Sequence, residues 1–412
     1  MLIDLDQATH AMSGGKAAPL ARLLRAGMPV PPGFVVPTYA YEHAIADVDV
    51  GGAARCGAAV ARTLVEQSML APTTAAEIPA ALARIAGPST DGYVAVRSSA
   101  TTEDGNGATA AGQHDTVLGV RGTDQVLDAV RRCWASLWSD RAVAYRRRQP
   151  AGPGAAPPSI AVVVQRLVDA DVAGVMFTGP ATRIEASWGL GEGVVSGHVT
   201  PDIWWVTDGA VAHRALGSKL TRIDRAGAQV VTGQVPPADR DRLCLTDQDV
   251  LGLDRIGHQI QQLLGRPHDV EWAIADGQIW ILQARPITAD LPARPMASSG
   301  PAQAGAIFTG TPAGAGVAEG PVRVVLGPDD FDRVKPGDVL VCRTTDPAWT
   351  PLFSIVAAVV TENGGLLSHA AIVAREHGLP AVLAVPDATT TLPEGATARV
   401  DGGSGRVVMT SC

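Results

Sequence analysis

The sequence has few cysteines, few aromatic residues and little charge. Its 412 residues include five cysteines, 4% aromatic residues and 18% charged residues. Cys56, Cys133, Cys244, Cys342 and Cys412 stand alone, and no C-x-x-C pair occurs. This spacing excludes a zinc-ligand framework. A low and odd number of cysteines is typical of a reduced, cytoplasmic protein, which is the location that we expect.

Long apolar runs and an excess of basic charge are also missing. No apolar run reaches the roughly 18 residues that a transmembrane helix needs. Residues 1–6 contain acidic side chains and no basic segment, so a signal peptide is not expected. The net charge of −8 disfavours a sequence-independent nucleic-acid binder, which needs a basic surface. We therefore expect neither a membrane nor a nucleic acid as a partner.

What the sequence does contain is enough apolar material for folded domains. Hydrophobic residues make up 46% of the chain, which excludes disorder as its overall state. The length suggests roughly two to four domains. Residues 289–304 contain three prolines among small residues and are predicted to be an interdomain linker. The proline-rich residues 150–158 interrupt regular structure, and we interpret them as a surface loop.

Apolar periodicity predicts helices and strands on both sides of the linker, and the fold class is therefore α/β (α+β). Before the linker we expect buried strands at 93–97 and 160–165, and a helix over 123–148. After it we expect a small β/α/β domain with a helix over 368–377 and strands at 322–326, 339–342, 357–361 and 381–385.

Two segments of the first part carry cations in positions suited to phosphate. Lys16 follows the flexible pair Gly14-Gly15 at a predicted helix start, where backbone N–H groups would add to its charge. The pattern is not a Walker P-loop, and a solvated lysine is the alternative. Arg97 ends a buried strand, where a guanidinium is costly unless it meets an anion. That anion is either a ligand or an internal carboxylate.

Glycine-containing loops come next along the chain. Residues 110–116, which include Gly112 and Thr116, form a loop able to bring backbone N–H groups to a phosphate. Residues 188–193 are also dense in glycine, but they do not fit G-x-G-x-x-G. A structural turn is the better interpretation there.

The segment from Asp269 to Arg285 is predicted to be a β-hairpin around Asp276-Gly277. With a three-residue loop, Glu271 lies opposite Gln283 and on the same face as Arg285. A two-residue loop would turn Glu271 to the other face. The first register groups a carboxylate, an amide and a guanidinium, which suits Mg²⁺ and a polyphosphate. An exposed hairpin with a surface ion pair is the alternative.

One histidine lies at a predicted helix start after a Gly-Gly turn. Ser368 is a suitable N-cap, Gly378 a suitable C′ residue, and Pro380 stops the helix. His369 then lies in the first turn, where free N–H groups and the dipole favour an anion such as a phosphorylated ring. Neutral imidazole is also a competent nucleophile near neutral pH. A capping or core role is the alternative, and we assign it to His377.

Taken together, these motifs resemble the superfamily of phosphoenolpyruvate synthase, pyruvate phosphate dikinase and rifampin phosphotransferase. The amino-acid sequence of the histidine segment is most similar to that of the rifampin branch. The matching segments are Gly14-Gly15-Lys16 and residues 96–101, 111–116, 164–165, 174–178, 185–192, 282–288, 345–353 and 364–376.

The resemblance implies an ATP-grasp nucleotide-binding domain over residues 1–288 and a swivelling phosphohistidine domain over 305–412. It implies that His369 takes the β-phosphoryl group of ATP, with release of AMP and phosphate. It also implies Mg²⁺ at Glu271 and Gln283. The residues implied to contact ATP are Lys16, Arg97, Gly112, Thr116, Gln165, Glu271, Gln283 and Arg285.

The sequence departs from the family pattern in three places. The rifampin enzymes have a long acceptor-binding domain where this chain has only residues 289–304. The synthases and dikinases carry a C-terminal TIM barrel for pyruvate, whereas this sequence stops at Cys412. Leu367 holds the place of a threonine usual in the dikinases, so we expect one hydrogen bond to the histidine to be missing.

These features predict a compact ATP-dependent phosphotransferase that acts on a small-molecule hydroxyl, enol or carboxylate. The alternative is a phosphoryl-carrier subunit whose acceptor domain is a separate protein. A nucleotide-sensing protein without turnover is a third class, which His369 and the Glu271, Gln283 and Arg285 set argue against.

Overall fold

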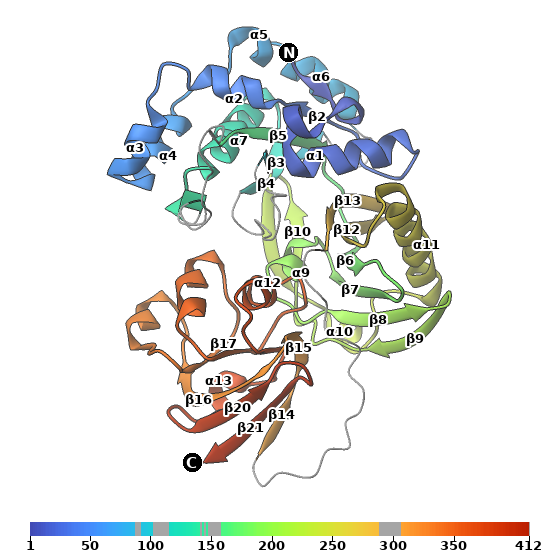
Figure 1. Ribbon diagram of the computed structural model, residues 1–412. Coiled ribbons are helices and arrows are strands. Elements are labelled where there is room, and N and C mark those ends of the chain that lie inside the picture. Colours follow the sequence, from blue (N-terminus) through green and yellow to red (C-terminus); the bar gives the residue numbers. More distant parts are fainter. Residues whose placement is uncertain are drawn as a thin grey trace.

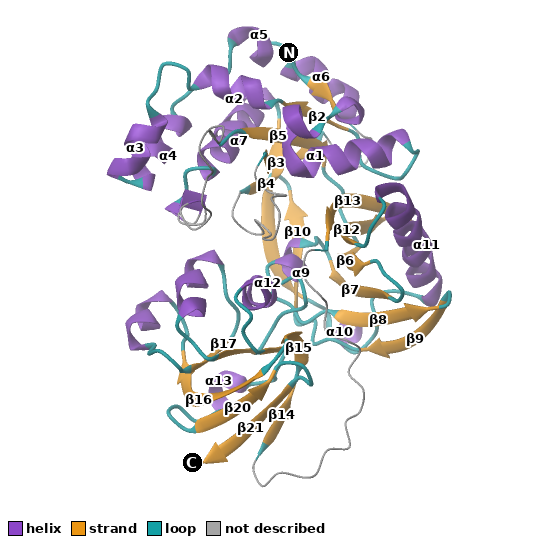
Figure 2. Ribbon diagram, in the orientation of Figure 1, coloured by secondary structure: helices purple, strands orange, loops and turns teal. Residues whose placement is uncertain are grey.

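A computed structural model describes residues 1–86, 92–101, 115–140, 142–143, 146, 158–287 and 306–411 (Figure 1). Gly112 and the predicted linker 289–304 lie outside these ranges. The described residues form an α/β structure with helices around several sheets (Figure 2). None of the described helices combines the length and the apolar character that a membrane crossing requires.

The first layer is an antiparallel five-stranded sheet in the order β1-β2-β5-β3-β4. Its strands are β1 (Ile3–Asp4), β2 (Gly33–Val36), β3 (Tyr93–Ala100), β4 (Thr116–Arg121) and β5 (Ile160–Arg166). The helices around it are α1 (His10–Arg25), α2 (Thr38–Ala44), α3 (Val50–Cys56), α4 (Ala58–Glu66), α5 (Pro72–Ala75), α6 (Ile78–Ile85) and α7 (Thr123–Ser136), and residues 5–7 form a short 3-10 turn.

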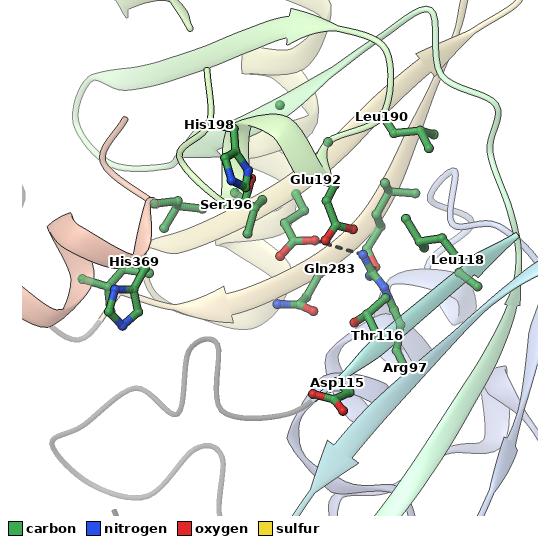
Figure 3. A pocket seen from close by; sticks show the side chains of 18 of the residues that line it. Arg97, Asp115, Thr116, Leu118, Leu190, Glu192, Ser196, His198, Gln283 and His369 are labelled. Carbon is green, nitrogen blue, oxygen red and sulfur yellow. Dashed lines mark hydrogen bonds and ion pairs between the residues drawn. The ribbon is translucent and has the colours of Figure 1, made fainter. Parts of the chain in front are cut away.

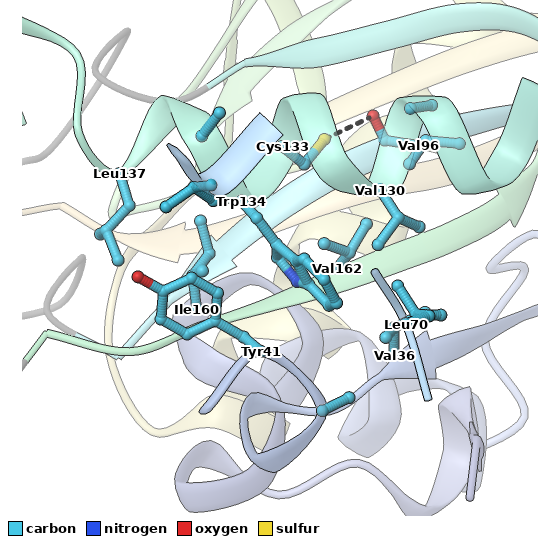
Figure 4. Packing of buried hydrophobic residues seen from close by; sticks show 14 of the residues in the cluster. Val36, Tyr41, Leu70, Val96, Val130, Cys133, Trp134, Leu137, Ile160 and Val162 are labelled. Atoms are coloured by element: carbon cyan, nitrogen blue, oxygen red, sulfur yellow. Dashed lines mark hydrogen bonds between the residues drawn. The ribbon is translucent and has the colours of Figure 1, made fainter. Parts of the chain in front are cut away.

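Helix α7 buries the apolar face that its spacing predicts. Val130 and Trp134 pack with Val96 and Ile160 of the sheet, and the Trp134 ring meets Tyr41 edge-on at 5.8 Å between centroids (Figure 4). The helix ends at Ser136 rather than continuing to 148. The cause is local, because the Ser139 hydroxyl accepts a hydrogen bond from the Ala142 backbone N–H and so caps a new turn.

The second layer is an antiparallel six-stranded sheet in the order β13-β12-β6-β7-β8-β9. Its strands are β6 (Val172–Phe177), β7 (Thr182–Trp188), β8 (Asp202–Thr207), β9 (Ala210–Ala215), β12 (His268–Ala275) and β13 (Gln278–Pro286). Helices α9 (Glu192–Val195), α10 (Pro237–Arg240) and α11 (Asp247–Leu264) and the hairpin of β10 (Thr221–Ala226) with β11 (Gln229–Gln234) complete this part.

The hairpin of β12 and β13 reaches the expected register by an unexpected route. Its turn has two residues, because Ala275 pairs with Gln278. A bulge then skips Leu282, so that Glu271 lies opposite Gln283 after all. Of the two loops considered, the two-residue turn is present, but the orientation of Glu271 expected from it was wrong. The extra residue that restores the register lies within β13 instead of in the turn.

The C-terminal part is an eight-stranded sheet in the order β14-β21-β20-β16-β17-β18-β19-β15, with β16 to β19 parallel at its centre. Its elements are β14 (Ile307–Thr309), β15 (Thr311–Gly314), β16 (Val317–Val324), β17 (Val339–Cys342), β18 (Ala358–Thr361), β19 (Ala381–Leu383), β20 (Thr397–Asp401), β21 (Arg406–Ser411), α12 (His369–Glu376) and α13 (Ala388–Thr391), with 3-10 segments at 328–333 and 347–354.

Three of the predicted strands in this part differ in their bounds, one of them by a single residue, since β18 begins at Ala358 and not at 357. The strand expected over 381–385 ends at Leu383, because Ala384 takes a left-handed conformation with φ of 55°. The strand expected over 322–326 begins earlier, at Val317, since residues 317–321 pair with β20 before the strand joins β17. The antiparallel strands β14, β15, β20 and β21 were not predicted.

The C-terminal part packs against the second sheet through a shared apolar cluster. Val175 and Phe177 of β6 and Val194 of α9 belong to the same buried cluster as Leu366 and Leu367. Helix α12 thereby lies beside α9 (Figure 1). The start of α12 consequently faces the space between the two sheets.

Gly14 offers a test of how α1 is held. It has φ of 70°, and a Cβ there would lie 2.2 Å from the Ser99 carbonyl oxygen. Gly27 has a similar φ of 75° with no heavy atom within 4 Å of such a Cβ. We expect Gly27→Ala to cost about 1 kcal/mol of stability and Gly14→Ala clearly more, measured as unfolding midpoints. Equal losses would contradict the proposed crowding.

Candidate functional site

A cavity of about 1060 Å³ lies where the two sheets and the C-terminal part meet. His369 lies at one end in Figure 3, Arg97 at the other, and Glu192 and Gln283 between them. The cavity brings together all the described residues that the sequence nominated: Lys16, Arg97, Thr116, Gln165, Glu271, Gln283, Arg285 and His369. Gly112 lies outside the described residues.

Lys16 lies in the first turn after the break at Gly14, as expected for a helix start. Its ammonium donates to the Ser98 carbonyl at 2.9 Å. The backbone N–H groups of Lys16 and Ala17 both donate to the Ser99 hydroxyl, at 3.0 and 3.3 Å. The expectation that these N–H groups would face a phosphate is therefore wrong for these two donors. Only the side chain of Lys16 brings its charge to the cavity.

Arg97 connects the two sheets. Its Nη1 donates to the Leu282 carbonyl at 2.9 Å, and its Nη2 lies 3.1 Å from Glu271 Oε2. Leu282 is the residue that the bulge in β13 leaves unpaired, so its carbonyl is available to the guanidinium. Of the two anions that the sequence allowed for Arg97, the internal carboxylate is present. Arg97 nevertheless lines the cavity.

Glu192 is a site residue that the sequence reasoning missed. It opens α9 in the glycine-dense segment that was interpreted as a structural turn. The protein around it partly desolvates its carboxyl, which raises its pKa; the Arg97 charge opposes this shift, and the Glu271 charge adds to it. Ser196 and His198 also line the cavity and were missed, with Ser196 Oγ 2.6 Å from His198 Nδ1.

The oxygen donors of the cavity have the chemistry of a magnesium site. Glu271 and Gln283 are opposite each other across the hairpin, and Glu192 is close enough to Glu271 for their charges to interact. Two carboxylates and an amide are ligands suited to a hard divalent cation. Within the described ranges, no group of three His, Cys, Asp or Glu side chains is arranged to hold a metal, so the amide would be needed.

Arg285 lines the cavity from a position that is also structural. Its Nε donates to Asp269 Oδ2 at 2.8 Å, and the Asp269 side chain is only 8% exposed. Burial raises the pKa of Asp269, and Arg285 lowers it. The hairpin face is therefore not simply open to ligand. One of its residues neutralises a buried carboxylate.

Gln165 of β5 and Thr116 of β4 reach the cavity from the two strands that flank β3 in the first sheet. The Gln165 side chain is buried, and its Nε2 donates to the Pro31 carbonyl at 2.9 Å. Thr116 pairs with Arg97 in the ladder between β3 and β4. These two residues line the wall of the cavity beside the Arg97 guanidinium.

His369 begins α12, and Ser368 caps this helix as predicted, since its hydroxyl accepts from the Ala371 N–H at 3.4 Å. Thr345 Oγ1 lies 2.8 Å from His369 Nδ1, and Thr350 Oγ1 lies 3.2 Å from Nε2. Leu367 was expected to deprive the ring of a hydrogen bond. Thr345, which precedes His369 by 24 residues, bonds to the ring instead.

Comparison with known proteins gives two family matches. Residues 10–299 match the model described as pyruvate phosphate dikinase, AMP/ATP-binding domain. Residues 334–405 match the model described as PEP-utilising enzyme, mobile domain.

Similar full-length proteins carry related names. A probable phosphoenolpyruvate synthase of Methanothermobacter thermautotrophicus is 39% identical over 98% of this chain and 62% of its own length. One from Archaeoglobus fulgidus is 37% identical over 98% of this chain and 57% of its own. A phosphoenolpyruvate synthase of Pseudomonas aeruginosa is 37% identical over 93% and 54%. The chain thus spans 54 to 62% of the length of these relatives.

The pair of Arg285 and Asp269 predicts a loss of stability that depends on pH. Arg285→Met leaves a buried carboxylate unpaired, which costs about 3 kcal/mol. Burial already raises the folded-state pKa of Asp269, and the substitution raises it further. Protonation therefore favours the folded state of the variant. The loss of stability of Arg285→Met relative to the parent should be largest near neutral pH and should become smaller as the pH falls.

Thermal midpoints of the parent and the variant at pH 7.5 and at pH 5 measure this effect. Arg62→Met is the matched control, because its ion pair with Glu66 is exposed and should matter little at either pH. A deficit for Arg285→Met that is the same at both pH values would contradict the role of the Asp269 charge.

Proposed function

Because the chain belongs to the superfamily of phosphoenolpyruvate synthase and pyruvate phosphate dikinase, we propose that it is an ATP-dependent phosphotransferase of the dikinase type. His369 would carry the phosphoryl group from ATP to an acceptor. The observation that supports this most is the shared cavity, because the predicted nucleotide contacts and the His369 imidazole line the same space. Membership of the rifampin branch stays a prediction.

Charge in the cavity suits a polyphosphate. Lys16, Arg97 and Arg285 place three cationic groups around it, and preorganised charges of this kind stabilise a phosphoryl group in transfer. Thr116 and Gln165 add polar contacts, and Gly112 stays a predicted contact. Glu271 and Gln283 would hold Mg²⁺, with Glu192 as a further oxygen donor. Bound Mg²⁺ would offset the negative charge of the polyphosphate oxygens.

The reaction at His369 follows from a neutral imidazole nitrogen as nucleophile. A bond forms between this nitrogen and the β-phosphorus as the bridge between the α and β phosphates breaks, and AMP leaves. Water then cleaves the bridge between the β and γ phosphates, and inorganic phosphate leaves. The phosphohistidine that remains would pass its group to a small-molecule hydroxyl, enol or carboxylate.

The first test is the phosphohistidine itself. With Mg-ATP, the purified protein should gain one acid-labile phosphoryl group at His369, detected by intact mass and by peptide mapping after an alkaline quench. Glu271→Gln should slow this step by roughly 100-fold, the scale for one preorganised charged group. His377→Asn is the control on the same helix and should label normally. Label that persists in His369→Ala would overturn the proposal.

Thr345 generates a second prediction. Its bond to Nδ1 holds the ring in one orientation, so Thr345→Val should slow phosphohistidine formation by about tenfold, the scale of one hydrogen bond. The KM for ATP should not change, since Thr345 acts on the ring. Thr345→Ser keeps the hydroxyl and should restore most of the rate. Equal rates for Thr345→Val and the parent would remove this role.

The acceptor is the part of the proposal that needs a screen. AMP release in the presence of a metabolite panel would identify a small molecule that accelerates turnover. If turnover instead requires a second polypeptide, the chain is the phosphoryl-carrier subunit of a two-component system.

A further inference from the structure

A buried carboxylate lies outside the cavity, where the two parts of the molecule meet. Glu185 of β7 is fully buried. Its Oε1 accepts from Nε and Nη2 of Arg183, at 2.9 and 2.6 Å. Its Oε2 accepts from the Leu366 backbone N–H at 3.0 Å, a residue 181 positions further along the chain. We propose that Glu185 is a positioning residue that docks residues 362–368, the histidine loop between β18 and α12, in their ATP-facing arrangement.

The backbone of the histidine loop is shaped for this contact. A Cβ on Gly365 would lie 2.2 Å from Glu185 Oε2, so any other residue there would push the carboxylate away. A second close approach lies nearby, where a Cβ on Gly197 would come within 2.6 Å of Ser368 Cβ. Thr344 Oγ1 also donates to the Gly197 carbonyl at 3.3 Å. Both approaches flank the turn that leads directly into His369.

The charges around Glu185 explain why a carboxylate can be buried here. Arg183 is 2% exposed and neutralises it within the ATP-binding part. Arg375 of α12 comes from the other part. Burial lowers the pKa of Arg375 to about 10, although the charges of Asp269 and Glu185 act to raise it. Docking thus places a second arginine in the field of the same carboxylate.

Glu185 adds a directional contact to the apolar interface. Val175, Phe177 and Val194 pack with Leu366 and Leu367, but apolar contacts are non-directional. The bond from Leu366 N–H to Glu185 fixes one backbone position three residues before His369. Because Glu185 does not line the cavity, its influence on the reaction must pass through this loop.

The chemistry of the contact provides a sharp variant. Glu185 accepts three hydrogen bonds, two from Arg183 and one from Leu366, and all of them come from N–H groups. The isosteric Glu185→Gln must therefore place its NH₂ group against a donor. Gly365→Ala disturbs the same contact from the other side. Asp202→Asn is the matched control, because Asp202 is also a buried carboxylate that accepts three hydrogen bonds from N–H groups, those of Gly217, Lys219 and Cys244.

The experiment measures three quantities in the full chain. Hydrogen exchange of the peptide that contains Leu366 reports docking and needs no activity. Nucleotide affinity reports the ATP site, and the rate of phosphohistidine formation reports the first half-reaction, which rests on the proposed function. In Glu185→Gln and Gly365→Ala we expect faster exchange at Leu366 and roughly tenfold slower phosphohistidine formation. Nucleotide affinity should stay within about twofold of the parent.

The outcomes separate the docking role from the proposed function. Exchange at Leu366 and phosphohistidine formation at the parent rates in both variants would overturn the docking role. Faster exchange and slower phosphohistidine formation in Asp202→Asn, with unchanged nucleotide affinity, would also overturn it. If the parent forms no phosphohistidine while the two variants still lose protection at Leu366, the docking role is supported and the proposed function fails. Unfolding midpoints of all variants establish that each is folded at the assay temperature.

Discussion

The geometry of the cavity depends on the contact between Arg97 and the bulged strand β13. A guanidinium within a buried strand must find an anion or a carbonyl, and Arg97, which lies inside β3 and not at its end as predicted, finds both across the gap between the two sheets. The carbonyl is available because Leu282 is left out of the ladder. The bulge that turns Glu271 toward Gln283 therefore also provides the acceptor that holds the first sheet to the second.

The three cationic residues of the cavity that the sequence nominated each have an internal contact. Lys16 bonds to a backbone carbonyl, Arg97 to Glu271 and Arg285 to Asp269. Such contacts fix the side chains before any ligand arrives, so less conformational entropy is lost on binding. They also limit what each group can do. Arg285 cannot leave Asp269 without depriving a buried carboxylate of its ion pair.

The local parts of this site could be predicted from the sequence, and the long-range parts could not. The start of α12, its Ser368 cap and the position of His369 follow from residues that are close in the chain, and the structure confirms them. The pairing of Glu271 with Gln283 was one of the two registers considered, and the structure has it through a two-residue turn with a bulge, which gives the same pairing as a three-residue loop. Periodicity alone does not distinguish them.

The missed features all depend on tertiary contacts. Thr345 bonds to His369 because the 3-10 segment at 347–354 packs beside α12, which no motif spacing reveals. Glu192 gains its role from the proximity of Arg97 and Glu271, which come from other strands. The antiparallel strands β14 and β15 at the edges of the C-terminal sheet span only three and four residues, which is too short for a clear period. They form because neighbouring strands offer them partners.

The interface between the two parts combines an apolar cluster with a buried polar contact. Its apolar cluster favours contact, and the buried pair of Arg183 and Glu185 makes that contact specific. The ion pair of Glu185 with Arg183 lies within one part, so separation would leave this pair intact while it breaks the Leu366 hydrogen bond and moves Arg375 out of the field of Glu185. A contact of this kind is directional when formed and keeps the buried carboxylate paired when it is released. Both properties are needed if one histidine is to meet ATP and an acceptor in turn.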